Sequence, residues 1–271
     1  MKAMMRPSKV LKKLRAGKTA NSFKMNLADS RAYQIAASHG FDCLWTCMEH
    51  VPNDFSVIEN AVMATKIYDV DLLCRVSRGS YSDYVRPLEM DATGIMVPHI
   101  MSLEDAKKVI WMTRFPPIGR RPADGGNADG AYCNIPFTEY IKQANAERFV
   151  IFQIEDPEPL PELDAIAALE GYEMLFFGPG DYSLAIGVPG ELEHPEVAKV
   201  RKLIVETAHK HGKFAGTVAS PANYKQILDM GYDFINLGAD VHGINTYCAQ
   251  MAKVFGISDS DLTGGYYSSS K

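Results

Sequence analysis

Eight short apolar segments alternate along the chain with amphipathic segments, and this alternation limits the possible folds more than any other feature. Segments such as Phe149–Ile154 and Met174–Phe177 consist mainly of large apolar side chains, which is typical of strands buried on both faces of a parallel sheet. The segments between them space their apolar residues as helices do. Eight strand–helix units in 271 residues favour a (β/α)8 barrel, the TIM barrel.

The same alternation gives the expected positions of the elements. We expect strands at residues 22–27, 41–46, 70–76, 94–98, 149–155, 174–177, 213–218 and 234–237, and helices at 7–17, 31–38, 57–69, 81–90, 103–113, 137–146, 161–169, 195–211, 221–230 and 243–255. A doubly wound open sheet is the alternative fold, but the GxGxxG motif that would favour it does not follow the first strand. No shift in composition marks a second domain. We therefore expect one domain over residues 1–257 and a flexible polar tail over 258–271.

The composition argues against several classes of partner. A net charge of -5, from 28 basic and 33 acidic residues, gives no sign of a nucleic-acid surface, and the basic residues within 9–18 are expected on a solvated helix face. No apolar run approaches the roughly 18 residues that cross a membrane, and no secretory signal begins the chain. The five cysteines lack CxxC spacing and are expected to be reduced, buried thiols of a cytoplasmic protein.

The longest irregular stretch covers residues 115–132 and is rich in Pro, Gly and Asp. Loops of this length within a compact domain are usually lids or binding loops. We therefore expect this stretch to serve as one or the other.

Two acidic residues follow two consecutive predicted strands. Glu155 ends the segment that begins at Phe149, and Asp181 follows the strand Met174–Phe177 after the turn Gly178-Pro179-Gly180. Carboxylates at neighbouring strand ends could share one hard cation. The alternative is that Asp181 caps a helix and Glu155 is an ordinary loop acid.

In a barrel, the carboxyl ends of all the strands face one mouth, so the residues at those ends meet. His50 could act there as a general base, or be a structural histidine. Arg75 suits a carboxylate or enolate, or a salt bridge at the rim. The turn before Asp181 could bind an anion through its amides, or be only a tight turn. The strand ends carry Glu49, His50, Arg75, Pro98, His99, Gln153, Glu155, Gly180, Asp181, Val218, Ala219, Gly238 and Asp240.

These residues give the chain a resemblance to a known family. From about residue 14 to 252 it resembles the class II, metal-dependent 2-oxo-acid aldolases typified by 4-hydroxy-2-oxoheptanedioate aldolase, the HpcH/HpaI group. The order and spacing of the motifs together are specific, although no single motif is. The motifs are Gly40-Phe41-Asp42, Glu49-His50, Pro52-Asn53-Asp54, Arg75, Val97-Pro98, Arg114-Phe115-Pro116-Pro117-Ile118-Gly119, Gln153-Ile154-Glu155, Gly178-Pro179-Gly180-Asp181-Tyr182-Ser183, His194-Pro195-Glu196-Val197 and Gly212-Lys213.

The resemblance implies a barrel of the phosphoenolpyruvate/pyruvate type. It also implies a homo-oligomer, trimeric or hexameric, whose last helix is exchanged between subunits. The apolar residues of the last predicted helix, 243–255, exceed what one barrel flank needs and favour the same assembly. By resemblance, Glu155 and Asp181 bind a divalent cation (Mg2+, Mn2+ or Co2+), Arg75 and Gln153 hold the pyruvate end, and amides near Gly180 and Asp181 hold its carboxylate. Because one carboxylate stands at each of two neighbouring strand ends, we expect these two to be the only protein ligands of the cation. His50 is then the base, and Val218 lines the apolar side of the pocket.

Several positions depart from the family pattern. The residue three before His50 is commonly an Asp that pairs with the histidine, and here it is Cys47. Glu89 stands where an Asp of a neighbouring subunit usually approaches the site, and Asp91 replaces a helix-ending glycine. Arg121-Pro122 replaces the usual Arg-Gly. The pyruvate and metal end is thus retained, whereas the base and the acceptor end are altered.

These observations predict a divalent-metal-dependent lyase that cleaves or forms the carbon–carbon bond of a 4-hydroxy-2-oxo acid. Its partners would be a small 2-oxo acid and an aldehyde. Two alternatives stay open. One is another pyruvate-enolate enzyme, such as a decarboxylase, and the other is a catalytically weak barrel that only binds a 2-oxo acid.

Overall fold

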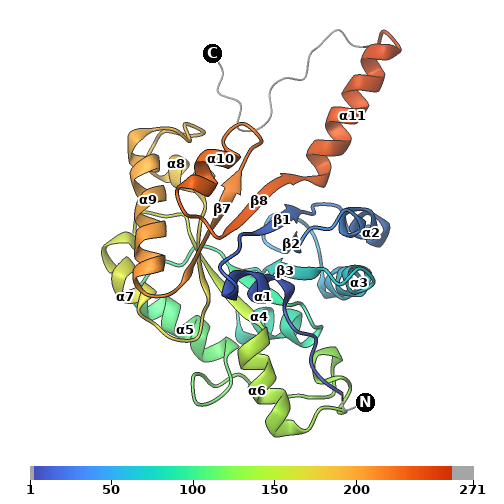
Figure 1. Ribbon diagram of the computed structural model, residues 1–271, viewed down its shortest axis with the longest axis vertical. Helices are drawn as coiled ribbons and strands as arrows, with labels where there is room; N and C mark the ends of the chain where they lie inside the picture. The colour runs from blue at the N-terminus through green and yellow to red at the C-terminus, as the bar shows by residue number, and fades with distance from the viewer. Residues whose placement is uncertain (1–2, 258–271) are drawn as a thin grey trace.

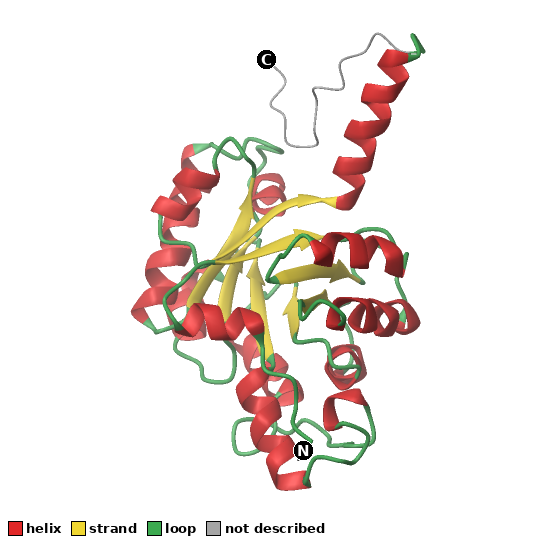
Figure 2. Cartoon of the chain, turned by 45° about the vertical axis from the view of Figure 1, so that its right-hand side comes forward, coloured by secondary structure: helices red, strands yellow, loops and turns green. Residues whose placement is uncertain are grey.

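The computed structural model describes residues 3–257, and these form a closed barrel of eight parallel strands (Figure 1). The strands follow one another around the barrel in chain order, and β1 pairs with β8 to close it. Helices surround the strands on the outside (Figure 2). The predicted (β/α)8 fold is therefore confirmed, and the open-sheet alternative is wrong.

The strands and helices have the following bounds. The strands are β1 Ala20–Lys24, β2 Cys43–Cys47, β3 Asp71–Arg75, β4 Gly94–Val97, β5 Phe149–Ile154, β6 Met174–Phe177, β7 Phe214–Ala219 and β8 Phe234–Ala239. The helices are α1 Lys9–Arg15, α2 Ser30–Ser38, α3 Phe55–Lys66, α4 Tyr81–Glu89, α5 Leu103–Thr113, α6 Phe137–Glu147, α7 Leu163–Ala167, α8 Pro179–Ala185, α9 Pro195–Lys210, α10 Tyr224–Asp229 and α11 Asp240–Val254, with short 3-10 turns at η1 Ala128–Gly130 and η2 Leu160–Glu162.

Two elements, β6 and α5, have the predicted bounds. Among the strands, β1 differs most from its predicted bounds. It was expected at 22–27 but ends at Lys24. The amides of Asn26 and Leu27 leave the sheet because they donate to the two carboxylate oxygens of Asp240, each at 2.9 Å. A long-range side-chain interaction thus ends this strand, and the local sequence does not show it.

The interior of the barrel is packed with side chains, and α1 closes its N-terminal end. Val10, Leu11 and Leu14 of α1 are buried in the same cluster as the inward-facing residues of the strands. Trp45 and Phe176 meet edge to face in this interior, with ring centroids 5.6 Å apart. The basic side chains of α1 stay on its outer side, as expected, although Lys13 pairs with Asp42 at 2.7 Å and Arg15 with Glu147 at 3.5 Å.

One buried carboxylate at this closed end anchors the segment before α1. Asp71 begins β3 and is fully buried. Its Oδ2 accepts from Ser8 Oγ at 2.7 Å and from the amide of Val10 at 2.8 Å, and its Oδ1 faces Arg6 at 3.2 Å. The charge is therefore compensated by several donors, which is the condition for a stable buried carboxylate.

Asp91 follows α4 in a left-handed conformation, with φ of 74°. Glycine adopts this conformation without strain, whereas other residues rarely do. Asp91 is buried, and its carboxylate pairs with the buried guanidinium of Arg148 and with Lys66. These two cations offer a reason why a charged residue ends the helix here.

The long irregular stretch at 115–132 does not cover the mouth of its own barrel. Phe115 and Ile135 pack with Met5 and with Tyr140 of α6, near the segment that precedes α1 (Figure 1). Arg121 lies over the ring of Phe115 at 4.6 Å. Whether the stretch serves as a lid or as a binding loop stays a prediction.

The last helix, α11, projects away from the barrel (Figures 1 and 2). Apolar side chains on and just after it are exposed, including Tyr247 at 62% and Val254 at 76%. The exchange of this helix between subunits stays a prediction. The expected tail at 258–271 lies outside the described residues.

Two further expectations concern the thiols and membranes. All five cysteines are free, but only Cys43, Cys47 and Cys74 are buried, so the expectation of buried thiols is wrong for Cys133 and Cys248. Among the described helices, none combines the length and the apolar character needed to cross a membrane.

Candidate functional site

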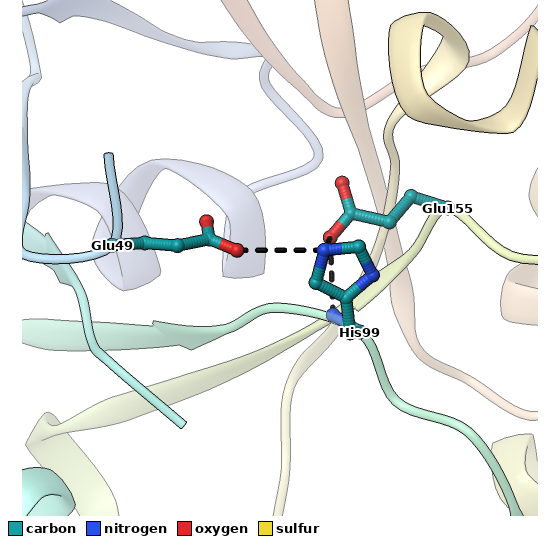
Figure 3. Close-up of side chains that lie close together, drawn as sticks. All are labelled: Glu49, His99 and Glu155. Carbon is teal, nitrogen blue, oxygen red and sulfur yellow. Dashed lines mark hydrogen bonds and ion pairs between the residues drawn. The ribbon is translucent and has the colours of Figure 1, made fainter. Parts of the chain in front are cut away.

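Three side chains from three strand ends converge in the barrel mouth (Figure 3). Glu49 follows β2, His99 follows β4, and Glu155 directly follows β5. One ligand atom of each lies within 4.8 Å of the others, and no second group of this kind occurs within residues 3–257. The parallel barrel explains the convergence, because it brings the carboxyl ends of all strands to one side.

His99 is held in a defined orientation by its neighbours. Its backbone is left-handed, with φ of 48°. Its amide donates to Glu155 Oε1 at 3.0 Å, and its Nδ1 lies 2.8 Å from Asp156 Oδ2. The other ring nitrogen, Nε2, lies 3.5 Å from Glu49 Oε1 and 3.7 Å from Glu155 Oε1. Burial disfavours the imidazolium, but the Asp156 hydrogen bond and the three nearby carboxylates raise the pKa of His99 overall.

Glu155 is 1% exposed and lies among both cations and anions. Burial raises the pKa of Glu155 to about 7; the charge of His99 opposes this rise, and Asp181 adds to it. The Nε2 of Gln153 donates to Glu155 Oε2, while Gln153 Oε1 is buried without a hydrogen-bond partner in the described part of the chain. Gly178 makes room for this pair, since a Cβ there would come within 2.6 Å of Glu155 Oε2.

Arg75 lies beside this cluster with its guanidinium fixed on several sides. It is 4% exposed, and its Nε lies 2.9 Å from Glu49 Oε2. Its Nε and Nη2 approach Cys47 Sγ at 3.3 and 3.2 Å, and the guanidinium lies 5.2 Å from the centre of the Trp45 ring. A buried cation with these contacts has little freedom to reorient, so it presents a fixed charge to a ligand.

Cys47 contacts Arg75, and it meets His50 only through the backbone. The amide of His50 donates to Cys47 Sγ at 3.4 Å. The group next to the His50 imidazole is Glu49, whose Oε2 lies 3.5 Å from Nε2. The side chain of His50 is 58% exposed, so it stands at the rim of the cluster. Cys47 therefore contacts Arg75, and the carboxylate beside the His50 ring is that of Glu49.

Comparison with known proteins identifies the family of the chain. Residues 24–245 match the family described as HpcH/HpaI aldolase/citrate lyase. The chain belongs to this family. The 2-keto-3-deoxy-L-rhamnonate aldolase of Klebsiella pneumoniae subsp. pneumoniae is 31% identical over 225 residues, which cover 83% of this chain and 84% of that protein.

Two solved structures of HpcH/HpaI proteins share the fold. The aldolase from Desulfitobacterium hafniense has a TM-score of 0.86 at 26% identity, over 94% of this chain and 98% of that one. A family protein from Burkholderia cenocepacia has a TM-score of 0.85 at 27% identity, over 92% and 99% of the two chains.

The structure brings some of the predicted residues of this HpcH/HpaI chain together. Arg75, Gln153 and Glu155 lie within one charged cluster. Asp181, in the first turn of α8 next to Gly180, influences the pKa of Glu155 but is not part of the group formed with Glu49 and His99. Val218 on β7 is partly buried against the apolar barrel interior.

Sequence reasoning did not single out Lys24 or Asp156, and it placed His99 at the mouth without its contacts. Lys24 ends β1, and its Nζ lies 5.2 Å from the centre of the Trp45 ring. Burial and the charge of Arg75 lower the pKa of Lys24. The position of Lys24 could have been predicted from the period-two alternation of a strand. Ala20 and Ser22 face the barrel interior, so Lys24, two residues further on, is expected on the same side. No local pattern around Asp156 indicates its contact with His99.

The donor set in the mouth fits a divalent cation. Two carboxylates and one imidazole nitrogen are ligands that divalent transition metals accept, and carboxylates alone suit Mg2+. The neighbouring Arg75 offers a positive charge for an anionic ligand at the same place.

Proposed function

We propose that this protein is a divalent-metal-dependent aldolase that cleaves or forms 4-hydroxy-2-oxo acids through the enolate of pyruvate or a close relative. The aldolase names in its family and among its relatives support this reaction class. The observation that carries the proposal is the buried carboxylate of Glu155 at the end of β5, beside Gln153 and within the field of Arg75. Such an arrangement can hold a cation and a 2-oxo acid together.

The pyruvate end of the substrate binds between Arg75 and Gln153. The guanidinium of Arg75 is already fixed by Glu49 and Cys47, so it can stabilise the charge that develops on the 2-oxo oxygen without reorganising. Amides in the turn at Gly180 and Asp181 bind the carboxylate, and Val218 lines the apolar side.

The divalent cation is Mg2+, Mn2+ or Co2+, and it supplies Lewis-acid stabilisation of the enolate charge. Glu155 is the ligand we assign to it first. Asp181 is the second ligand expected from the sequence.

His50 accepts the proton of the 4-hydroxyl group in the cleavage direction, and an aldehyde leaves. Its imidazole is more than half exposed, so the proton can pass on to solvent. Glu49, at 3.5 Å from Nε2, stabilises the imidazolium that forms. The carboxylate that serves His50 is thus two residues from the position where the family commonly has its Asp.

We also propose a cytoplasmic homo-oligomer, trimeric or hexameric. The exposed apolar side chains of α11 support the assembly, because a helix that projects from its own barrel needs another surface to cover them.

The test is exchange of the methyl protons of pyruvate in deuterated water, followed by NMR with and without added metal. We expect metal-dependent exchange by the wild type and a loss on the order of 10³-fold in Glu155→Gln, because this carboxylate holds the cation. Glu158→Gln, an exposed residue in the same loop, is the matched control. Undiminished exchange by folded Glu155→Gln contradicts the proposal.

Proton exchange, combined with assays for aldol product and for decarboxylation, separates the alternative functions. An aldolase also converts pyruvate and aldehydes to 4-hydroxy-2-oxo acids, and His50→Ala lowers that rate by roughly 10²-fold while sparing pyruvate binding. A decarboxylase exchanges protons without aldol product and releases carbon dioxide from oxaloacetate. A barrel that only binds a 2-oxo acid shows no exchange.

A further inference from the structure

We propose that the closed end of the barrel carries a binding site for a small anion with two linked phosphate groups, in a hollow beside α1 that four lysines line. This end lies away from the mouth, because α1 closes the barrel there, so the inference does not depend on the proposed reaction. The hollow is lined by Lys9, Lys12, Lys13, Ala16, Lys18 and Asp42.

Positive charge is concentrated in α1 and in the turn that follows it. Residues 9–18 contain five basic residues and no acidic one, whereas the chain as a whole has a net charge of -5. The apolar side of α1 is buried in the barrel interior, so its lysines are displayed on the outer side. A run of like charges is commonly no more than a solvated face. The case for a site therefore depends on the shape of this surface and on the pairing of its charges.

Two hollows lie along the outer side of α1. The first has a volume of about 370 Å³, and the second, which the four lysines line, has a volume of about 310 Å³. Lys12 and Ala16 line both, so the hollows adjoin at this part of the helix. Sites for small molecules have volumes of about 300–1,000 Å³. The second hollow therefore has room for a small anion.

The acidic residues that line the two hollows are already paired. Asp42 is buried, and its Oδ2 accepts from Lys13 Nζ at 2.7 Å and from the amide of Asn21 at 2.9 Å. Glu147, in the first hollow, lies 3.5 Å from Arg15. The carboxylates of this surface are therefore used by neighbouring groups, and the remaining lysines keep their charge uncompensated.

Three of the lysines have no such partner. The ammonium groups of Lys9, Lys12 and Lys18 form no ion pair or hydrogen bond with any residue in the range 3–257. Lys12 and Lys18 are exposed, and Lys9 is partly buried. Like charges around one hollow repel one another, and an anion placed between them replaces that repulsion with attraction. The hollow thus offers three unused donors to one anionic ligand.

The donors indicate the class of ligand. Lysine binds phosphate as a point charge with freely turning donors, whereas arginine favours planar, two-pronged contacts. Two linked phosphate groups carry about three to four negative charges near pH 7, which suits three unpaired ammonium groups. A single phosphate carries about half this charge and should bind more weakly. Inorganic diphosphate and a nucleoside diphosphate share the required chemistry.

The experiment is titration calorimetry on the full chain with inorganic diphosphate, orthophosphate and ADP, at constant ionic strength. Because diphosphate also binds divalent cations, each titration is recorded on the protein as purified and again after its metals are removed on a chelating resin. The test variant is Lys12→Gln/Lys18→Gln. The matched control is Lys107→Gln/Lys108→Gln, which removes the same charge from exposed lysines of α5 outside both hollows.

We expect diphosphate to bind saturably, and orthophosphate to bind roughly 10-fold more weakly because it offers less charge. Lys12→Gln/Lys18→Gln should weaken diphosphate binding on the order of 10-fold or more, since two charge-assisted contacts are lost, and the control should bind as the wild type does. ADP that binds as tightly as diphosphate supports a nucleotide ligand, and ADP that binds more weakly supports inorganic diphosphate. Binding that disappears with the metals, or that weakens equally in both variants, overturns the proposal.

Lysine acetylation, followed by mass spectrometry, locates the site on the wild type. Diphosphate should slow the acetylation of Lys9, Lys12 and Lys18 several-fold and leave that of Lys107 unchanged. The ligand should also raise the unfolding midpoint, because it binds only the folded chain. Equal acetylation with and without diphosphate overturns the assignment. None of these readouts uses turnover, so they are independent of the outcome of the aldolase assays.

Discussion

At the N-terminal end of the barrel, the carboxylates of Asp71 and Asp42 are paired with donors of the chain itself, whereas at the mouth Glu155 lies beside a buried acceptor, Gln153 Oε1, that has no partner among residues 3–257. Asp71 accepts from a hydroxyl and an amide and faces a guanidinium, and Asp42 pairs with Lys13 and an amide.

In the mouth, by contrast, Gln153 Oε1 is buried without a hydrogen-bond partner, and His99 Nε2 lies 3.5 Å from Glu49 Oε1 and 3.7 Å from Glu155 Oε1. Buried polar groups are normally paired, so the unpaired acceptor of Gln153 beside Glu155 indicates where a polar ligand would complete the mouth. The buried carboxylates of the closed end therefore serve stability and the open end serves the binding of a substrate, which is the division of labour typical of this barrel.

The largest effect on stability is expected from a substitution at the closed end. Asp71→Ala removes a fully buried acceptor, so the Ser8 hydroxyl and the Val10 amide lose this partner and Arg6 keeps only its other contacts. We expect a loss of about 3–5 kcal/mol in the free energy of unfolding by urea.

The matched control for Asp71 is Asp69→Ala, whose exposed carboxylate lies 3.5 Å from the same Arg6 and should contribute less than about 1 kcal/mol. Activity per folded molecule should be unchanged in both. Similar losses of stability in the two variants would show that the closed end does not depend on the buried carboxylate.

The second test uses pH at the open end. Burial raises the pKa of Glu155 to about 7, above the value of 4.5 that applies to an unperturbed carboxyl. The folded, metal-free protein therefore holds this proton more tightly than the unfolded chain. The resulting stability is present below about pH 4.5 and is lost as the pH rises to about 7, by up to about 3 kcal/mol.

The measurement for this pH effect is the unfolding midpoint of the metal-free protein, compared between wild type and Glu155→Gln. The difference between the two should change between pH 5 and pH 7.5 and then level off. Added metal should stabilise the wild type more at pH 8 than at pH 5, because the cation and the proton compete for one carboxylate. A constant difference across this range would show that Glu155 does not titrate there.

The smallest effect is expected from two thiols on the same strand. Cys47→Ser weakens the contact with the Arg75 guanidinium at 3.2 Å. The KM for the 2-oxo acid should therefore rise several-fold, which corresponds to a loss of about 1 kcal/mol in binding free energy. Cys43, at the other end of β2, is buried near α1 and far from the charged cluster. Cys43→Ser should lower the unfolding midpoint and leave KM unchanged. A rise in KM for both variants would show that the two ends are not independent.

The sequence predicted the barrel and the strand that carries Glu155, because Phe149–Ile154 and Met174–Phe177 are apolar enough to be identified alone. It also placed Arg75, Gln153 and Glu155 on one side, since strand ends of a barrel share a mouth.

It could not predict which side chain contacts which across the barrel. Cys47 and Arg75 are paired by the register of β2 and β3, and the role of His99 depends on Asp156, 57 residues away. Contacts of this kind depend on the closure of the sheet, which no local pattern encodes.

The left-handed Asp91 has an evolutionary consequence. Replacing it with glycine would relax the backbone but leave the buried guanidinium of Arg148 without its carboxylate, and replacing Arg148 alone would leave a strained aspartate beside Lys66 only. Each single substitution thus passes through a less stable chain. Among relatives of this protein, an acidic residue at this helix end should be inherited together with the arginine, and the two should be gained or lost as a unit.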